Sequence, residues 1–422
     1  MGSDLKMDKT FHKQNREALY RNIEKNSVVL LFSGTAPRKT ADEYYPFFAN
    51  RNFVYMTGIQ KPDSVFMAVS ENGTVQETLF ILPKDKMAER WTGSRLTPEQ
   101  AEDACAIADI KSVNDFEAIF LKAVQSEKYE NIYMDFDKLS KNEPDSRAYE
   151  LAELLKKLYP YIKLKNLSSL IKSQRTIKKD CEIQAMKTAQ KITRQGIIAM
   201  MKASRPGLYE YQLKAEFDYA LAQNGVLSPA FPSIISSGKN NFFIHYYDYL
   251  GLCSDGDMVL NDVGACWDNE CNDVSRGWPC NGRFSEKQKL LYTCAYNTSQ
   301  HMFSIIKPGM PMKSVDETIK KYTFEQLRDI KLCARFEDIG TYMWHGGSHH
   351  VGYDVHDWVI YPQSIEPGMV FCVDVGIYCE EWGIGFRLED NCLVTDDGCI
   401  NLSEQTPRTI EDIEAIMQKR IF

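Results

Sequence analysis

The chain has 422 residues, of which 44% are hydrophobic, and a formal net charge of −8 at pH 7. That length is too great for one ordinary hydrophobic core, so two domains are expected. The acidic balance argues against nucleic acid or an anionic membrane as the main partner, and no apolar run is long enough to cross a membrane.

The twelve cysteines are scattered and form no C-x-x-C pair, and the N-terminal residues lack the apolar stretch of a signal peptide. Scattered cysteines in a long chain are typical of reduced thiols rather than of a disulfide framework or a zinc ribbon. We therefore expect a cytoplasmic protein.

The first part of the chain alternates helical and strand-like patterns. Residues 8–26 carry spaced apolar positions among charges and predict a helix. Further helices are expected near 97–108, where Thr97 and Pro98 form a typical helix start, and near 146–158. This order is typical of an α/β domain with a largely buried sheet. Its predicted strands are residues 27–33, 64–70, 77–83 and 131–136.

A polar, charged segment near residues 166–178 marks a domain boundary. We place an N-terminal domain at residues 1–172 and a catalytic domain at residues 173–422. The second domain reads as helices, strands, helices and strands, which favours an α+β domain built from two similar halves. Its predicted helices are residues 179–204, 209–224, 286–306 and 312–330, and its predicted strand regions are 228–237, 257–267 and 335–400.

Two aspartates lie in the segment LNDVGACWDNECNDVSRG. Asp262 has an apolar, strand-like context, and Asp273 follows eleven residues later, so a hairpin could bring both onto one face. Two buried carboxylates close together repel and would not both ionise without a cation between them. The structural alternative is that Asp262 caps a turn and Asp273 pairs with Arg276.

The segment HGGSHHVGYDVHD holds four of the seven histidines: His345, His349, His350 and His356. The first two have the spacing of a helical zinc pair. However, the glycines between them are poor helix residues, and the glutamate of H-E-x-x-H is missing. A glycine-rich loop that enters a strand, with alternate histidines facing a cavity, fits better. Each single histidine has a structural role as its alternative.

A third segment, IEPGMVFCVDVGIYCEEWGIGFRLEDNCLVT, places Asp374 after an apolar strand and Glu389 in another strand near Arg387. A lone charge in such a strand is costly unless it is paired or bound to a metal. The alternative for Glu389 is an ion pair with Arg387 or with another neighbour.

Carboxylates combined with one imidazole suit a pair of hard divalent ions better than a structural zinc. A serine hydrolase is the competing enzyme class, but GGSHH lacks the final glycine of G-x-S-x-G. A P-loop and a dinucleotide-binding fingerprint are also missing from the sequence. The protein is therefore predicted to be a metal-dependent hydrolase if five side chains converge: Asp262, Asp273, His349, Asp374 and Glu389.

These segments, in this order, resemble the aminopeptidase P and prolidase family of metallopeptidases. In the first domain, similarity to bacterial aminopeptidase P rests on APRKTADEYYPFFANRNFVYMTG and ERWTGSRLTPEQ. In the second, the family's motifs are matched by SIISSGKNNFFIHYYD, by the aspartate and histidine segments above, and by IEPGMV and GIGFRLEDNCLVT of the third segment. The resemblance covers nearly the whole chain. It implies an α+β fold, with a C-terminal pita-bread (creatinase/aminopeptidase-like) domain preceded by an α/β domain of the aminopeptidase P type.

The resemblance implies two divalent metal ions. Asp273 and Glu389 would bridge them, Asp262 would complete the shell of one ion, and His349 and Asp374 would complete that of the other. Manganese is the expected metal, because oxygen ligands dominate, and zinc or another metal is the alternative.

The resemblance also implies roles for residues around the metals. His245 would contact the substrate near the scissile bond, His356 would assist the tetrahedral intermediate, and His345 would shape the proline pocket. Arg387 would lie beside the last metal ligand. Trp91 matches a residue that the family can lend to a neighbouring subunit, so a homo-oligomer, either a dimer or a tetramer, is expected.

The implied activity is that of an Xaa-Pro aminopeptidase, whose substrate is a peptide with proline at the second position. An Xaa-Pro dipeptidase (prolidase) is the alternative within the family. Creatinase shares the fold but works without the metal cluster, and methionine aminopeptidase lacks such an N-terminal domain. The alternative of another class is a catalytically impaired pita-bread protein that serves as an interaction module.

The chain departs from the family pattern at three places. Asp374 and Val375 stand where the family usually has glutamate and proline, and that glutamate is both a ligand and the base. Gly277 replaces a threonine, which would remove a hydroxyl close to the metals. The loop between Asp357 and Ile365 is shorter than in the bacterial enzymes of the family and has no arginine. This difference affects how a longer peptide would be held.

Overall fold

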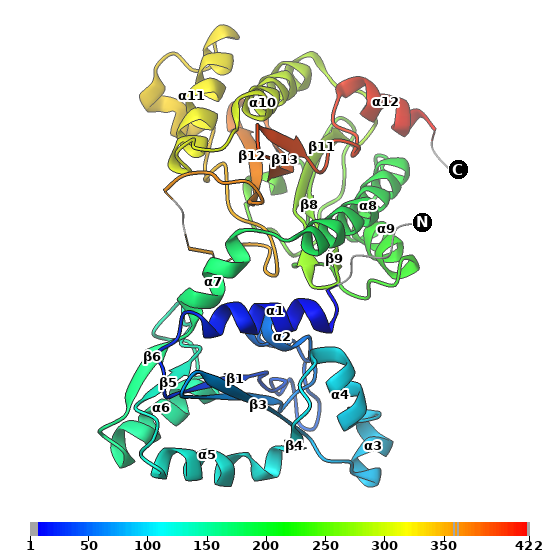
Figure 1. Cartoon of the computed structure of the whole chain (residues 1–422). Helices are drawn as coiled ribbons and strands as arrows, with labels where there is room; N and C mark the ends of the chain where they lie inside the picture. Colours follow the sequence, from blue (N-terminus) through cyan, green and yellow to red (C-terminus); the bar gives the residue numbers. More distant parts are fainter. Residues whose placement is uncertain (1–6, 358, 361–362, 420–422) are drawn as a thin grey trace, which may run out of the picture. The chain divides into compact units, whose positions relative to one another are not determined.

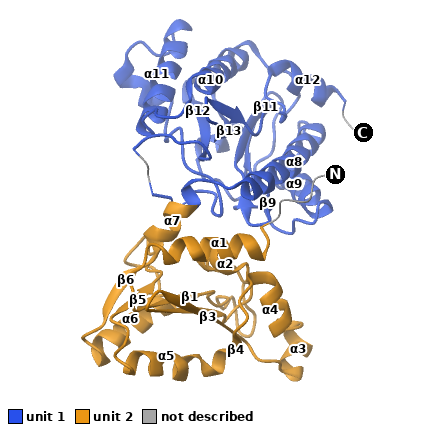
Figure 2. Cartoon of the chain, viewed as in Figure 1, with its two compact units in different colours: residues 1–6, 175–422 blue, residues 7–174 orange. Residues whose placement is uncertain are grey.

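The computed structural model describes residues 7–357, 359–360 and 363–419. It divides into two compact units, residues 7–174 and the described part of residues 175–422, shown in orange and blue in Figure 2. The segment around the predicted boundary at 172/173 is helical, because it forms α7 (Ser168–Thr176).

The first unit is built on a six-stranded mixed sheet with the order β4-β3-β2-β1-β5-β6. The pairs β1–β2 and β2–β3 are antiparallel. The pairs β1–β5, β5–β6 and β3–β4 are parallel. The strands are β1 (Ser27–Phe32), β2 (Val65–Glu71), β3 (Thr74–Ile81), β4 (Ile110–Ser112), β5 (Asn131–Met134) and β6 (Lys163–Asn166).

Helices cover both faces of this sheet because successive residues of its central strand are apolar. Val28 and Leu30 pack with residues of α5 and α6. Val29 and Leu31, which alternate with them along the strand, are equally buried. Figure 1 shows α1 and α2 on one side of the sheet and α5 on the other. The helices are α1 (Lys9–Tyr20), α2 (Arg51–Thr57), α3 (Lys86–Thr92), α4 (Pro98–Cys105), α5 (Phe116–Gln125), after the short η1 (Val113–Asp115), and α6 (Arg147–Leu158).

The second unit contains two three-stranded antiparallel sheets with the orders β11-β8-β7 and β12-β13-β14, and a small β9–β10 hairpin. Strand β13 lies next to β8 and β11, so the two larger sheets meet there. The strands are β7 (Ile234–Ser237), β8 (Met258–Val263), β9 (Cys266–Trp267), β10 (Glu270–Cys271), β11 (Val274–Pro279), β12 (Val370–Cys379), β13 (Ile384–Val394) and β14 (Cys399–Asn401).

A pair of packed helices precedes each of the two larger sheets, as the sequence predicted. The pairs are α8 (Asp180–Ala203) with α9 (Glu210–Gln223), and α10 (Glu286–Ile305) with α11 (Lys313–Asp329). The unpredicted α12 (Ile410–Gln418) packs against α8. Three short 3₁₀ segments complete the described elements: η2 (Gly238–Phe242), η3 (Phe336–Thr341) and η4 (Glu380–Trp382).

The prediction of a strand-rich stretch over residues 335–400 is wrong in its first half. Described residues from 342 to 369 form loops and isolated bridges, and the long strands begin at Val370. Apolar side chains of this loop, such as Met343, Val351 and Tyr353, are buried, which imitates a strand pattern in the sequence.

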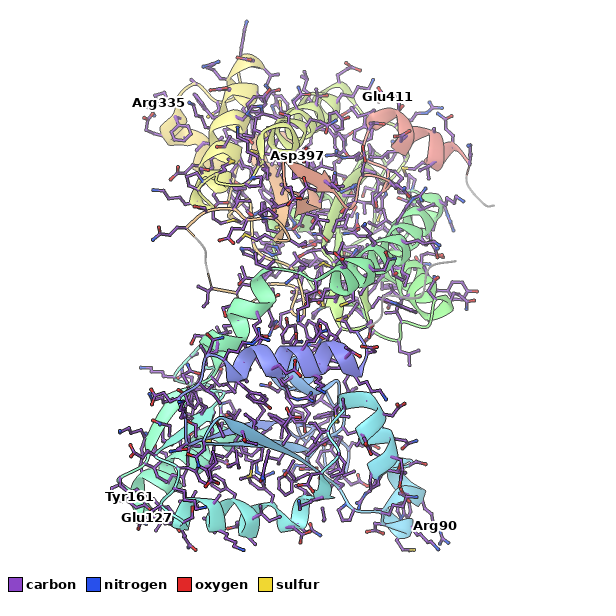
Figure 3. All side chains as sticks on the ribbon, in the orientation of Figure 1. Arg90, Glu127, Tyr161, Arg335, Asp397 and Glu411 are labelled. Carbon is purple, nitrogen blue, oxygen red and sulfur yellow. The ribbon has the colours of Figure 1, made fainter. Side chains whose placement is uncertain are left out.

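One hydrophobic core joins both halves of the second unit and includes Phe217, Trp278, Tyr292 and Phe386. Figure 3 shows side chains filling the space between helices and strands, with charged groups such as Arg335 and Glu411 at the edges. No helix in the described part of the chain combines the length and the apolar character that crossing a bilayer requires.

Candidate metal centre and active site

Three strands of the second unit carry predicted carboxylate ligands, and the fourth carboxylate directly precedes another strand. The β12–β13 register places Asp374 directly opposite Glu389. In the other sheet, Asp262 of β8 lies opposite Ser275 of β11, and Asp273 immediately precedes β11. Carboxylate oxygens of Asp262, Asp273 and Glu389 all lie within 4.8 Å of one another. The structure therefore brings together residues from both sheets, with the β9–β10 hairpin inserted between the two aspartates.

His349 reaches the same point from a loop. Its Nε2 lies 3.6 Å from Asp273 Oδ2 and 3.4 Å from Glu389 Oε1. The loop is held against β12, because the backbone N–H of Cys372 donates to the carbonyl oxygen of His349 at 2.9 Å. The glycine-rich loop that the sequence favoured is therefore what the chain forms, in place of a zinc-binding helix.

Asp374 lies at the margin of this cluster. Its Oδ2 is 3.2 Å from His345 Nδ1. Among the described residues, three groups of side chains are close enough to share an ion, and Asp374 belongs to none of them. Aspartate is one methylene shorter than the glutamate expected from the family pattern, which accounts for its shorter reach.

The cluster carries more negative charge than its surroundings balance. Burial and the carboxylates of Asp262 and Glu389 raise the pKa of Asp273 well above its usual value. Burial and Asp374 likewise raise the pKa of Glu389. Burial would raise the pKa of Asp262 as well, but the Arg387 guanidinium outweighs it and lowers that pKa. Like-charged buried carboxylates of this kind are typical of cation sites.

Orphaned oxygen atoms provide a direct test of whether a metal fits. The Oδ1 atoms of Asp262, Asp273 and Asp374 are buried, and no described residue donates a hydrogen bond to them. Buried polar atoms without partners are costly. Oxygen ligands with one imidazole are the donor set that a pair of divalent ions requires. The residues present therefore fit a metal pair.

Comparison with known proteins agrees with this geometry. Residues 184–396 match the model of metallopeptidase family M24, and residues 12–133 match that of the aminopeptidase P N-terminal domain. The chain belongs to metallopeptidase family M24. The resemblance to aminopeptidase P and the pita-bread architecture behind an α/β N-terminal domain are thus confirmed.

Relatives of this M24 peptidase match over nearly its full length. The Xaa-Pro aminopeptidase of Haemophilus influenzae is 27% identical over 433 residues, covering 98% of each chain. A candidate aminopeptidase P from Bacillus anthracis has a solved structure with a TM-score of 0.96 and 35% identity, covering 98% of this chain and 99% of that one. Pseudomonas aeruginosa aminopeptidase PepP gives a TM-score of 0.91 and 27% identity over the same shares.

The two arginine ion pairs considered as alternatives for the ligands are not formed, although His349 Nε2 lies 3.4 Å from Glu389 Oε1. Arg387 does not pair with Glu389, because its Nη2 donates to Asp262 Oδ2 at 2.9 Å and its Nη1 donates to the Tyr378 hydroxyl at 3.1 Å. Glu389 instead accepts a hydrogen bond from Ser275 Oγ at 2.9 Å.

Arg276 does not pair with Asp273 either. Its Nη2 donates to Asp390 Oδ1 at 2.6 Å, and its Nη1 donates to the carbonyl oxygen of Glu389 at 2.7 Å. Both candidate partners of the ligand carboxylates therefore bond elsewhere, which leaves Asp273 and Glu389 available for ions.

Two further predicted histidines border the cluster. His345 Nε2 lies 3.0 Å from the Tyr378 hydroxyl. Burial lowers the pKa of His345, but the nearby Asp374 carboxylate outweighs it and the net shift is upward. The ring of His356 is 4.2 Å from that of His349, and its nitrogen lies within 4.8 Å of ligand atoms of Asp273 and His349.

His245 lies in the exposed turn that follows η2. Its ring stacks on Tyr247 at a centroid distance of 6.3 Å. The preceding carbonyl, that of Ile244, accepts a hydrogen bond of 3.2 Å from Arg387 Nη1. The turn that carries His245 is thereby tied to the arginine that contacts Asp262.

His350 packs in the protein interior beside the metal centre and is not in any of the groups of described side chains close enough to share an ion. It is buried, and its ring meets Phe371 edge-on at 5.9 Å. Cys372, on β12, is buried. Its Sγ also lies within 4.8 Å of ligand atoms of His349 and Glu389, so this thiol borders the metal centre.

Sequence reasoning missed the residues that hold the ligands. Asn391 donates to the backbone oxygen of Asp273 at 2.9 Å and accepts from its N–H at 3.1 Å. Tyr378 and Ser275 bond His345 and Glu389. Strand alternation offered a signal, because Asn391 lies two residues after Glu389, and Ser275 two after Asp273, on the same strand face.

The expectation that Gly277 removes a hydroxyl beside the metals is wrong. A Cβ at this position would come within 2.7 Å of Phe386 Cβ and 3.3 Å of Met258 Cε, so the position faces the apolar core. Ser275 provides a hydroxyl at the centre instead. The short loop after Asp357 lies partly outside the described residues, at 358 and 361–362.

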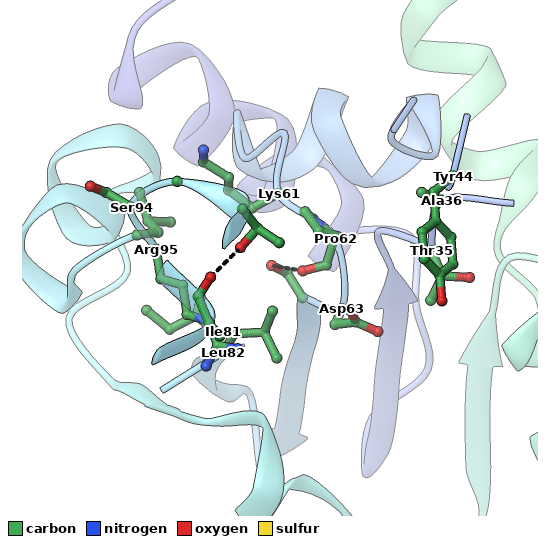
Figure 4. A pocket seen from close by; sticks show the side chains of 15 residues that line it. Thr35, Ala36, Tyr44, Lys61, Pro62, Asp63, Ile81, Leu82, Ser94 and Arg95 are labelled. Atoms are coloured by element: carbon green, nitrogen blue, oxygen red, sulfur yellow. Dashed lines mark hydrogen bonds between the residues drawn. The ribbon is translucent and has the colours of Figure 1, made fainter. Parts of the chain in front are cut away.

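A separate cavity of about 530 Å³ lies in the first unit, lined by residues that include Tyr44, Lys61, Ile81 and Arg95. Figure 4 shows these side chains around it. None of the predicted ligands lines it, so it plays no part in the metal centre.

Proposed function

We propose that this M24 peptidase is an Xaa-Pro aminopeptidase, which hydrolyses the bond between an N-terminal residue and a following proline. The observation that carries the proposal is the convergence of Asp262, Asp273, Glu389 and His349 within a chain matched along its length by Xaa-Pro aminopeptidases. Proline's tertiary amide has no N–H to donate, so such bonds need a dedicated peptidase.

We assign two divalent ions to this centre, held by Asp262, Asp273, His349, Asp374 and Glu389. Manganese is the proposed metal, because carboxylate oxygens dominate the donor set, and zinc is the alternative. When bound, such a pair lowers the pKa of water towards neutrality and polarises the scissile carbonyl.

The protein's own side chains then position the substrate and move protons. Asp374 accepts the proton of the attacking water and passes it towards the leaving proline nitrogen. Partial burial and the nearby His349 lower the pKa of His356 to about 4. The His356 ring is therefore neutral at pH 7, and its N–H can donate to the developing oxyanion.

Residues around the ligands fix the remaining geometry. Arg387 lowers the pKa of Asp262, against the effect of burial, and keeps it ionised. His345 lies between Asp374 and Tyr378, where it borders the proposed proline site. His245 lies on the exposed turn joined to Arg387 and would contact the substrate near the scissile bond.

We propose that catalysis resides in residues 173–422 and that residues 1–172 form the N-terminal domain. Trp91 of α3 is 86% exposed, which supports a homo-oligomer in which its indole is covered. All twelve cysteines are free, which supports a cytoplasmic location.

The experiment compares an Xaa-Pro-Xaa tripeptide with an Xaa-Pro dipeptide as substrates of the manganese-loaded protein. Elemental analysis of the same sample measures bound metal. Asp273→Asn serves as the inactive variant, and Glu411→Gln, on the exposed start of α12, is the matched control. Tripeptide cleavage with about two ions per chain is expected.

Other outcomes would replace the proposal. Cleavage of the dipeptide alone would make the protein a prolidase. Failure to bind any ion after manganese or zinc is added, together with no cleavage of either peptide, would favour the interaction module.

A further inference from the structure

The residue after His356 is the most firmly held carboxylate of the loop. The side chain of Asp357 is fully buried. Lys178 Nζ donates to its Oδ2 at 2.9 Å, and Arg175 Nη2 pairs with its Oδ1. The same guanidinium reaches Asp354 Oδ2 at 2.6 Å. The loop that carries His356 is therefore anchored by two buried cations that lie outside the metal centre.

The ring of His356 has no comparable anchor. The His356 ring meets the His349 ring at 4.2 Å, inclined at 62°, and its nitrogen lies within 4.8 Å of ligand atoms of Asp273 and His349. Within the described part of the chain, no side chain or backbone group forms a hydrogen bond with it. The position of this ring must therefore be set by the backbone that carries it.

That backbone is fixed at the next residue. The N–H of Asp357 donates to the carbonyl oxygen of His350 at 2.8 Å, and the N–H of Val359 donates to that of Asp357 at 2.9 Å. Asp357 is thus held on both sides and through its side chain. A shift of its carboxylate would be transmitted directly to the Cα atom of His356.

Gly352 permits the close packing of this loop on the cations. A Cβ at this position would lie 2.1 Å from Asp357 Oδ2 and 2.4 Å from Lys178 Nζ. Its carbonyl oxygen accepts from Cys271 N at 2.8 Å, which links the loop to the strand just before Asp273.

The lysine itself is rigidly placed. Lys178 Nζ donates to the carbonyl oxygen of Arg175 at 2.6 Å, and its backbone N–H donates to that of Gly368 at 2.8 Å. The free-energy cost of burying such charges is typically about as large as the gain from pairing them. Their value to the protein is therefore positional rather than a net gain in stability.

We propose that Asp357, clamped by Lys178 and Arg175, is the positioning residue for His356 and acts on it through the shared backbone. The inference rests on the proposed function, because His356 matters as the donor to the oxyanion. Asp357 does not touch the reacting atoms and supplies no ligand to the metals.

The choice of variant follows from the charges around Lys178. Two more buried carboxyl groups, Glu182 and Glu270, also act on this ammonium group. Removing Lys178 would leave three carboxylates without their cation and endanger the fold. Asp357→Asn retains size and one acceptor oxygen, and so isolates the clamp.

Asp354→Asn is the matched control, because it makes the same chemical change against the same arginine on the same loop. The Asp354 side chain is 37% exposed, whereas that of Asp357 is fully buried. We expect kcat of Asp357→Asn to fall about tenfold to a hundredfold with KM and metal content unchanged, since displacements near 1 Å have such effects. Asp354→Asn should stay within about twofold.

A double-mutant cycle separates positioning from general damage. If Asp357 acts through His356, Asp357→Asn should cause no further loss of kcat in a His356→Ala background. An undiminished additional loss would overturn the proposal, as would an unchanged kcat in the single variant. If Asp357→Asn does not fold, Asp357→Glu keeps the charge, displaces the carboxylate by one methylene, and should show the same pattern more weakly.

Hydrogen exchange tests the clamp without activity. The amide of Asp357 should exchange faster in Asp357→Asn than in wild type or in Asp354→Asn, because its hydrogen bond to His350 loosens. Equal exchange in all three proteins would overturn the proposal. If wild type cleaves no Xaa-Pro peptide but exchange still rises, the proposed function fails while the clamp stands.

Discussion

Glu389 and Asp390 are neighbours on β13, and both side chains are buried, yet they lie on opposite faces of the strand and in opposite electrostatic surroundings. Glu389 faces other carboxylates, and burial together with Asp374 raises its pKa. Burial would also raise the pKa of Asp390, but Arg276 and Arg408 outweigh it and the net shift is downward. Arg276 Nη2 lies 2.6 Å from Asp390 Oδ1, and Arg408 Nη2 lies 3.0 Å from Asp390 Oδ2.

The comparison teaches how a buried ligand differs from a buried structural charge. Asp390 is balanced by two guanidinium groups, so nothing further is needed to hold it ionised in the interior. Among the described residues, Glu389 has a serine hydroxyl and a histidine nitrogen as its polar partners, and the carboxylates of Asp374 and Asp262 repel it. A cation is the partner that its surroundings lack.

The largest effect is expected from Glu389→Gln. The amide keeps the shape of the side chain but lacks its negative charge, so metal content should fall. Turnover should drop by more than the roughly hundredfold loss that is typical when a residue hydrogen-bonded to a metal ligand is replaced. Elemental analysis and kcat on an Xaa-Pro-Xaa peptide measure both. Full activity with two bound ions would show that Glu389 is not a ligand.

Asp390→Asn should act on stability instead. Removing one member of a buried ion cluster leaves Arg276 and Arg408 uncompensated, which typically costs about 3–5 kcal/mol of unfolding free energy. Urea unfolding measures the loss, and any folded fraction should still bind metal. If Asp390→Asn were as stable as wild type but bound no metal, Asp390 rather than Glu389 would be the residue that the metal centre needs.

Variants of Asp374 separate the effect of its negative charge from the effect of its side-chain length. Asp374→Asn keeps the length and removes the base, so kcat should fall about a hundredfold, within the range for lost acid–base catalysis. Asp374→Glu keeps the charge and adds a methylene, and should retain activity within about tenfold of wild type. A glutamate variant as inactive as the asparagine variant would mean that this centre is built around the shorter side chain.

The sequence predicted much of this centre because strand patterns and ordered motifs are local. Asp262 and Glu389 lie in apolar strands where a lone charge needs an explanation. The predicted helix start at Thr97 is confirmed by its capping box with Gln100.

Partners from different sheets could not be predicted in the same way. Arg387 shares a strand face with Glu389, so pairing with it was the simplest expectation, but its guanidinium crosses to Asp262 in the other sheet. The chemistry of Gly277 was misjudged for the same reason, because Phe386, more than a hundred residues later in the sequence, fills the space beside it.

Gly277→Ala gives a smaller test, at the position of β11 where a Cβ would meet Phe386 and Met258. The new Cβ would lie 2.7 Å from Phe386 Cβ, and overpacking of this kind costs about 1–3 kcal/mol. Differential scanning calorimetry should show a lower Tm with unchanged metal content. Loss of metal at unchanged Tm would return this position to the metal centre, where the family pattern placed it.

The smallest effects should appear in the metal-free protein, as opposite responses of the two faces to pH. The folded-state pKa of Glu389 is raised, so the folded protein holds an extra proton just above the ordinary glutamate pKa, and stability falls as pH rises through that window. Glu389→Gln cannot ionise, so it should be more stable than wild type at neutral pH, with the difference vanishing in acid.

The folded-state pKa of Asp390 is lowered, so its contribution is present at neutral pH and is lost as pH falls through that pKa. The deficit of Asp390→Asn should therefore shrink in acid. Urea unfolding of both variants and wild type with a chelator, at neutral and at acidic pH, measures the two trends. Parallel rather than opposite changes would mean that the two faces of β13 do not differ in charge balance, and the assignment of Glu389 as a ligand would lose its electrostatic basis.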